Sequence, residues 1–171
     1  MFIEDMTLLS HSSPSPYSFP VSVKKGENWG YGLLEDGLVL CAVGWLGDFV
    51  PSEGKTPSEC VSRLWSAFNS KLVVSDGTAG WHNCELCHEE KDWYPGGQVG
   101  PIVKWRGRRL RVKGYGHFLI RTGEIVYLSP VLMLHYIIDH GYKPPDKFIE
   151  AVNQGVFLVP GDLIWVEDLP L

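Results

Sequence analysis

The run Trp81-His82-Asn83-Cys84-Glu85-Leu86-Cys87-His88 holds two cysteines separated by two residues, with histidines on both sides. A Cys-x-x-Cys turn lets two sulfurs converge on one ion, and two thiolates neutralise the charge of a divalent metal. Zinc takes about four ligands in a tetrahedron, and thiolate and imidazole suit it best. The run therefore predicts one half of a zinc site, whose second half must come from another part of the chain.

A helix with two further histidines is expected to supply the second half. The sequence from Ser129 to His140 looks helical, and His135 and His140 lie five positions apart, a spacing that zinc-finger helices also use. On an ideal helix these side chains lie roughly 140° apart, because each residue turns the helix by about 100°. The last turn must therefore tighten or fray, which Gly141 permits. We predict one zinc ion bound by Cys84, Cys87, His135 and His140.

Some of these residues have other interpretations. The chief rival for one ligand position is His82, followed by His88 and His117. Without a metal, His135 would be a histidine of the apolar core. His140 would then be a cation at a helix C-terminus, where the helix dipole favours positive charge.

Four protein ligands would close the coordination shell and make the zinc structural. A catalytic zinc keeps an open position for water and needs a carboxylate nearby as a base. The acids available for that role are Glu85, Glu89, Glu90, Glu124 and Asp139. Because two thiolates also make the metal less electrophilic, we expect a protein-interaction or regulatory module and assign no catalytic residue. A zinc-dependent hydrolase or nuclease is the main alternative.

The remainder of the chain predicts an α+β fold, with antiparallel β-hairpins and two or three helices around a zinc-finger-like metal site. Turn residues predict hairpins around residues 35–37, 106–107, 122–123 and 160–162. Helices are expected after Thr56-Pro57, Ser129-Pro130 and Pro144-Pro145. In the first of these, the Thr56 hydroxyl and Glu59 are expected to form a capping box.

Length and composition indicate one domain with a peripheral N-terminal segment. A chain of 171 residues can bury most of its apolar surface, and 44% hydrophobic with 20% charged residues is typical of globular proteins. Residues 1–28 are expected to be peripheral and partly mobile, because residues 10–16 are rich in Ser and Pro. Residues 29–171 are expected to form the single domain that contains the metal site.

The sequence favours a cytoplasmic protein without a membrane segment. No apolar run approaches the length needed to cross a bilayer, and the acidic N-terminus lacks the basic flank of a signal peptide. In the cytoplasm thiols stay reduced, so a metal explains the close cysteine pair better than a disulfide. The Cys-x-x-Cys-His run also matches the c-type haem attachment pattern, but that attachment requires export.

Basic residues are concentrated in one short stretch. Residues 104–113 hold six of the fifteen bases and no acid, which leaves nine bases against twenty acids elsewhere. Such a patch could hold phosphate or an acidic partner, although a solvated outer face of a strand is the favoured interpretation. The net charge of −5 argues against generic nucleic-acid binding by the whole surface. Another protein is the expected partner, and nucleic-acid binding through the Arg-rich hairpin is a further alternative. The patch residues are Arg106, Arg108, Arg109, Arg111 and Lys113.

Two segments resemble a family of small uncharacterised bacterial proteins. One is residues 80–87, with the His-x-Cys-x-x-Cys element, and the other is residues 125–152, with a His-Tyr and a His-x-Tyr-x-Pro-Pro pattern. The resemblance covers roughly residues 40–152 at the level of short motifs. That family has a small residue and a glutamate near residues 116–118, where this chain differs, which argues against His117 as a ligand. The resemblance supports the metal site and implies no activity.

Overall fold

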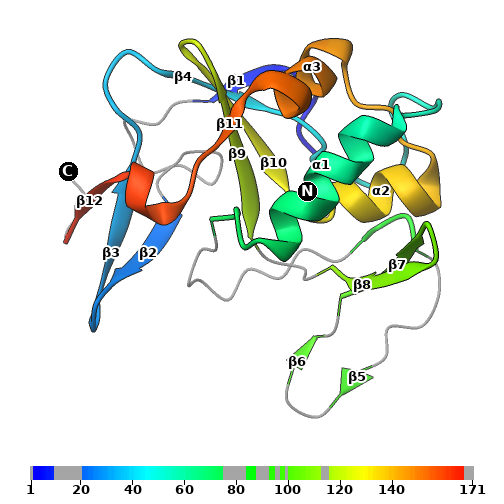
Figure 1. Ribbon diagram of the computed structural model, residues 1–171, viewed down its shortest axis with the longest axis horizontal. Helices are drawn as coiled ribbons and strands as arrows, with labels where there is room; N and C mark the ends of the chain where they lie inside the picture. The colour runs from blue at the N-terminus through cyan, green and yellow to red at the C-terminus, as the bar shows by residue number, and fades with distance from the viewer. Residues whose placement is uncertain are drawn as a thin grey trace.

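A five-stranded sheet in the order β1-β4-β10-β9-β11 forms the framework of the computed structural model (Figure 1). Its strands are β1 (Thr7–Leu9), β4 (Val39–Ala42), β10 (Ile125–Pro130), β9 (His117–Thr122) and β11 (Val156–Phe157). Strand β4 runs parallel to β10, and the other neighbours are antiparallel. The structure describes residues 2–9, 21–74, 84–87, 93–94, 97–98, 100–112 and 116–167.

Smaller sheets surround this framework. A three-stranded sheet has the order β12 (Ile164–Val166), β3 (Asn28–Leu33) and β2 (Val21–Lys25). Two hairpins pair β5 (Trp93–Tyr94) with β6 (Gly97–Gln98), and β7 (Ile102–Trp105) with β8 (Arg108–Arg111). The fold is therefore α+β, as predicted, and the expected hairpins around residues 106–107 and 122–123 are confirmed.

Two of the predicted hairpins are wrong. Strands β3 and β4 flank the turn at residues 35–37, yet they belong to different sheets. Strands β11 and β12 flank residues 160–162, but β11 pairs with β9 and β12 pairs with β3. Gly37 does have the positive φ, 87°, that the Asp-Gly sequence favours. A tight turn reverses the chain locally, but the pairing of a strand depends on which of its side chains are buried and against what.

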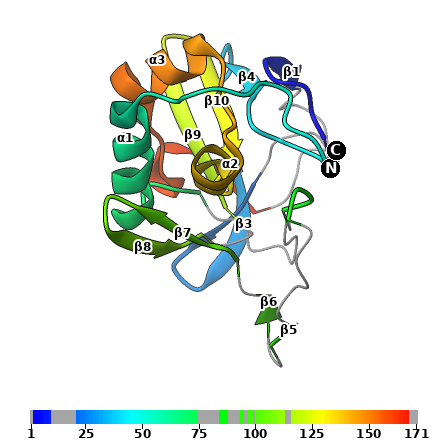
Figure 2. The ribbon, with the colours of Figure 1, turned by 90° about the vertical axis from the view of Figure 1, so that its right-hand side faces the viewer.

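Three helices lie together beside the main sheet: α1 (Ser58–Asn69), α2 (Met133–His140) and α3 (Asp146–Gln154) (Figure 2). Helix α1 follows Thr56-Pro57 as expected, but its predicted capping box is wrong, and the predicted start of α2 is also wrong. The Thr56 hydroxyl donates to the carbonyl of Tyr142 at 3.2 Å, so Pro57 is the N-cap of α1 and no capping box forms. Strand β10 continues through Pro130, because its last residues pair with β9, and α2 starts only at Met133.

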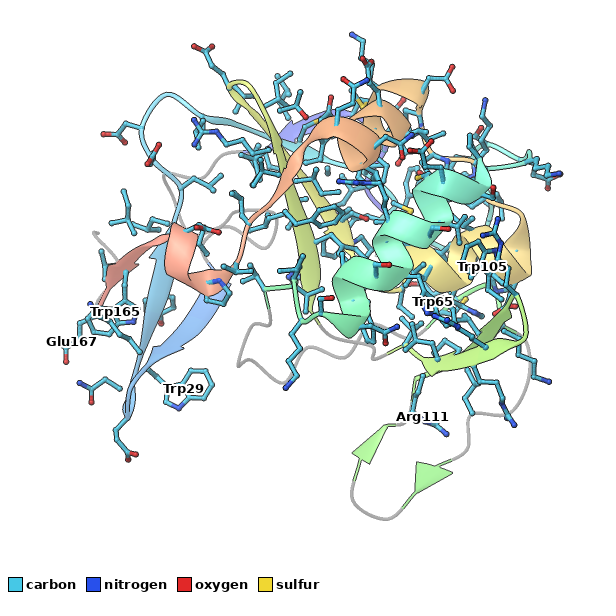
Figure 3. The ribbon with its side chains drawn as sticks, in the orientation of Figure 1. Trp29, Trp65, Trp105, Arg111, Trp165 and Glu167 are labelled. Carbon is cyan, nitrogen blue, oxygen red and sulfur yellow. The ribbon has the colours of Figure 1, made fainter. Side chains whose placement is uncertain are left out.

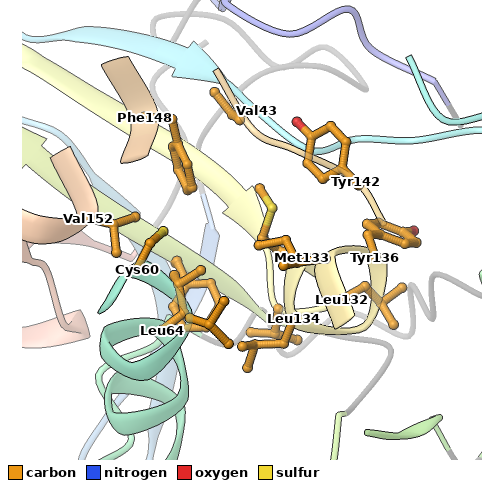
Figure 4. Close-up of a cluster of buried hydrophobic side chains, with 14 of the residues drawn as sticks. Val43, Cys60, Leu64, Leu132, Met133, Leu134, Tyr136, Tyr142, Phe148 and Val152 are labelled. Carbon is orange, nitrogen blue, oxygen red and sulfur yellow. The ribbon is translucent and has the colours of Figure 1, made fainter. Parts of the chain in front are cut away.

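The central strands bury both of their faces. Alternate side chains of β4, β9 and β10 enter two separate apolar clusters, as the period of two along a strand requires. The larger cluster lies between the sheet and the helices, and Figure 4 shows part of it. Its members there include Cys60 and Leu64 of α1, Met133 and Leu134 of α2, and Phe148 and Val152 of α3. This packing places α2 firmly, and α2 carries two of the four predicted metal ligands.

The N-terminal residues join the main sheet through β1. Ahead of that strand, the carboxylate of Asp5 accepts hydrogen bonds from the amide of Gly44 at 2.8 Å and from the hydroxyl of Tyr142 at 2.7 Å. The start of the chain is thus tied to the segment that follows α2. The Ser/Pro-rich residues 10–16, expected to be mobile, lie outside the described residues. In the described part of the chain, no helix has the length and apolar character needed to span a membrane.

Candidate metal centre

The cysteine turn and helix α2 bring four ligand side chains together. The ligand atoms of Cys84, Cys87, His135 and His140 all lie within 4.8 Å of one another. Cys84 Sγ is 3.3 Å from His140 Nε2, and Cys87 Sγ is 3.2 Å from His135 Nε2 and 3.4 Å from His140 Nε2. The two Nε2 atoms are 3.1 Å apart. Residues about fifty positions apart in the sequence thus form one cluster that could bind a metal ion.

These separations fit a tetrahedral metal. With Zn–S bonds of about 2.3 Å and Zn–N bonds of about 2.05 Å, a regular tetrahedron has S···N edges of about 3.6 Å and an N···N edge of about 3.3 Å. The four separations given above are shorter than these edges by a few tenths of an ångström. A small outward movement of the side chains would therefore admit an ion. Two sulfurs and two imidazole nitrogens are also a donor set that suits zinc.

The end of α2 explains how two histidines five positions apart meet. The amides of Gly141 and Tyr142 both donate to the carbonyl of Tyr136, so these bonds span five and six residues instead of four. The last turn is thus wider than an α-helical turn: of the two expected departures from an ideal helix, tightening or fraying, tightening does not occur. Because Gly141 has a φ of 67°, the chain can leave the helix directly after this turn. The rings of His135 and His140 meet edge to face at 4.7 Å.

Asp139 fixes the orientation of one ligand. Its Oδ2 atom lies 2.6 Å from Nδ1 of His135, one helical turn away. When Nδ1 carries a proton and donates it to this carboxylate, the lone pair of Nε2 points into the cluster. Metal-binding histidines are commonly held in this way, which raises their basicity. The sequence suggested Asp139 only as a possible base, whereas the structure places it behind a ligand.

Burial shapes the chemistry of the cysteine turn. The side chain of Cys84 is buried, and this desolvation, followed by the charge of neighbouring Cys87, raises the pKa of the Cys84 thiol to about 12. The backbone N–H groups of Leu86 and Cys87 donate toward the Cys84 sulfur and oppose this rise. A sulfur in such surroundings needs a cation beside it to be a thiolate near neutral pH.

Several contacts hold the segment after α2 in place. The amide of Gly54 donates to the carbonyl of Gly141, and the amide of Lys143 donates to the carbonyl of Ser52. Between them, Tyr142 is fully buried and bonded to Asp5. Because this segment begins directly after His140, these contacts help to fix the position of that ligand. Sequence patterns gave no sign of the contribution of Asp5, since it lies far from the site along the chain.

The structure places the other predicted site residues elsewhere or leaves them undescribed. His82 and His88, the alternative ligands, and the acids Glu89 and Glu90 lie outside the described residues. His117 lies in β9, where its buried ring stacks on Trp45 at 5.3 Å and its backbone bridges to Val74. Glu124 occupies the exposed turn between β9 and β10.

The predicted basic patch is a solvent-exposed hairpin. Arg106, Arg108, Arg109 and Arg111 are all exposed on β7–β8, and Lys113 lies outside the described residues. Strand β7 packs against α2, so the hairpin adjoins the helix that bears His135 and His140.

Comparison with known proteins assigns the chain to a family. A family model described as "Domain of unknown function (DUF7919)" matches residues 1–153, so the chain belongs to this family. The match includes all four residues of the cluster. Neither the curated proteins nor the solved structures contain a match.

Proposed function

We propose that this member of the DUF7919 family binds one structural zinc ion and serves as a protein-interaction or regulatory module of the bacterial cytoplasm. The observation that carries the proposal is the convergence of four ligand atoms, from a cysteine turn and a distant helix, within 4.8 Å. A cytoplasmic location suits such a site because thiols stay reduced there. The resemblance of residues 80–87 and 125–152 to a family of bacterial proteins supports a bacterial origin of this chain.

The donor set favours zinc over other common metals. Magnesium and calcium prefer oxygen ligands, and square-planar metals do not suit a tetrahedral cluster. Two cysteines and two histidines, by contrast, are a frequent ligand set of structural zinc. The four side chains would hold the ion, which would cross-link the cysteine turn to α2. The ion would also stabilise the two thiolates by its charge.

A closed shell supports a structural role. When all four protein ligands bind, no position is left for a water molecule or a substrate. The carboxylate nearest to the cluster along α2, that of Asp139, is occupied by His135. A base for metal-assisted hydrolysis would have to come from another acid. The zinc would therefore stabilise a domain that binds a partner, and would not catalyse hydrolysis.

The test is the metal content and coordination of the purified protein. Elemental analysis should give one zinc per chain. Replacement by Co²⁺ should give the intense visible absorption of a tetrahedral site with thiolate ligands. The Cys84→Ser variant should contain less zinc and should show weaker Co²⁺ absorption. X-ray absorption of the wild-type protein should show two sulfur and two nitrogen atoms around the metal. Absence of a transition metal would overturn the proposal, and a bound oxygen in place of one protein ligand would favour the hydrolase alternative.

A further inference from the structure

We propose that the outer face of the β7–β8 hairpin binds an acidic, extended segment of a partner protein. The register pairs Lys104 with Arg109 and Ile102 with Arg111. Residues directly opposite in an antiparallel pair share one face, so these four side chains form a single surface. All four are exposed. We call them the basic face.

The opposite face of the hairpin anchors it to the body of the protein. Val103 is fully buried, and Trp105 and Leu110 pack against the main apolar cluster. The Trp105 ring lies 6.0 Å from the ring of Trp65 in α1 (Figure 3). The hairpin is therefore held on its apolar side, and its basic face points away from the core.

Two features of the hairpin cost stability locally. Lys104 and Arg109 are like charges directly opposite each other, an arrangement that destabilises a sheet. Arg106 occupies the turn with a φ of 49°, a left-handed conformation that normally favours Gly, Asn or Asp. Its guanidinium lies 4.5 Å from the centre of the Trp105 ring, which compensates only in part. A sequence that departs from local preferences in this way is typical of a functional surface.

The positive charge of the basic face is not neutralised within the described part of the chain. Ion pairs between described residues join Arg121 to Glu35, His135 to Asp139, and Lys143 to Asp146. None of them involves the hairpin. A partner that carries carboxylates would supply the missing charge, and Ile102, 39% exposed, offers an apolar contact on the same face.

The dimensions and the surrounding charge favour a short acidic protein segment over nucleic acid. Four residue pairs give a face about 13 Å long. A longer polyanion would extend past residues 104–113 onto a chain that has nine bases against twenty acids, and would be repelled there. Since β7 and β8 form a two-stranded sheet, their outer edges can also pair with an added strand. Alternate side chains of that strand would then lie beside the basic side chains, on the same face of the extended sheet.

The test uses a fluorescein-labelled decapeptide of alternating Glu and Thr, with a Gln-Thr decapeptide and a ten-nucleotide oligothymidylate as comparisons. We expect the zinc-loaded protein to bind the Glu-Thr peptide best in an anisotropy titration. Lys104→Glu with Arg109→Glu should raise the Kd by at least about ten-fold. The matched double variant Lys55→Glu with Lys147→Glu makes the same charge change at exposed sites of the loop before α1 and of α3. It should raise the Kd by no more than about two-fold.

A third variant separates binding from hairpin stability. Arg106→Gly suits the positive φ of the turn and lies outside the basic face, so it should preserve or stabilise the hairpin and change the Kd by no more than about two-fold. Far-UV circular dichroism and zinc content should match those of the wild type in every variant. No preference for the Glu-Thr peptide, equal losses in the two double variants, or tighter binding of the oligonucleotide would each overturn the inference.

The inference rests on the proposed function, because the hairpin is seated on α2, which carries two of the zinc ligands. The two can nevertheless fail separately. A protein that contains no zinc overturns the proposed function before any peptide is added. A zinc-loaded protein that does not bind the Glu-Thr peptide overturns only the basic face as a docking surface.

Discussion

Asp139 allows the metal centre to be tested without removing a ligand. Its carboxylate accepts the Nδ1 proton of His135 at 2.6 Å, so Asp139→Ala should free the imidazole to rotate and to change tautomer. The ligand atom, Nε2, is untouched. A change in zinc affinity in this variant would therefore report how well His135 is oriented and polarised.

The size of the effect follows from the exposure of the pair. Loss of a carboxylate behind a metal-binding histidine typically costs ten- to a hundred-fold in metal affinity, or about 1.4 to 2.7 kcal/mol. The side chain of His135 is 4% exposed but that of Asp139 is 38% exposed, so solvent screens this interaction in part. We therefore expect a loss near about ten-fold for Asp139→Ala. Asp139→Asn keeps an acceptor oxygen at the same place and should lose less.

The assay is a competition titration of zinc between the protein and a chromophoric chelator at constant pH. Asp146→Ala is the matched control, because it removes another helical aspartate, paired with Lys143 and away from the cluster. It should leave the zinc affinity unchanged. If Asp139→Ala binds zinc as tightly as the wild type while Cys84→Ser does not, the assignment of Asp139 as a positioning residue is refuted.

Three further predictions concern the cysteines and one alternative ligand. Cys84→Ser should release zinc and lower the melting temperature, whereas His88→Ala should change neither. Mass spectrometry under native conditions will measure the bound zinc of each variant, and a thermal scan will measure its melting temperature. In a thiol titration of the native protein, chelation should make two thiols newly reactive, those of Cys84 and Cys87; four would mean global unfolding, because Cys41 and Cys60 are buried. Burial raises the pKa of the Cys60 thiol to about 12 from 9.0. The folded state therefore keeps this thiol neutral after the unfolded chain has ionised, and stability falls from pH 9 upward. Relative to Cys60→Ala, the wild type should lose about 1.4 kcal/mol per pH unit above pH 9 in urea unfolding.

The ligand cluster could be predicted from the sequence because its chemistry depends on residue type. Few side chains bind a soft divalent metal, so a close cysteine pair and a helix with two histidines leave few combinations. The shape of the last turn of α2 could not be predicted from residue types. Whether a turn tightens or widens depends on where the following segment is held. Here Tyr142, bonded to Asp5, holds it from the far end of the chain.

The pairing of strands β4 and β12, unlike the ligand cluster, could not be predicted from local sequence, because it depends on distant parts of the chain. The turns at Gly37 and at residues 160–162 were predicted at the right places, but the strands beside them pair with distant partners. Strand β4 pairs with β10, more than eighty residues away in the sequence, and β12 pairs with β3, more than a hundred residues away. Strand β4 thereby enters the five-stranded sheet, where three of its four residues are buried, and β12 joins the three-stranded sheet. Such burial outweighs a two-residue turn, whose contribution is small by comparison.

These distant contacts converge on one place, the segment from Asp139 to Lys143. The cysteine turn reaches it through His140, the N-terminus through Asp5, and the loop before α1 through Thr56 and Gly54. A metal bound there would add a cross-link between the cysteine turn and α2. Since α2 also supports the β7–β8 hairpin, loss of the metal should loosen the basic face before it unfolds the main sheet. Hydrogen exchange after chelation would then show early loss of protection in α2 and β7, with β4 and β10 still protected. Equal loss in all four elements would mean that the metal stabilises the whole fold as one unit.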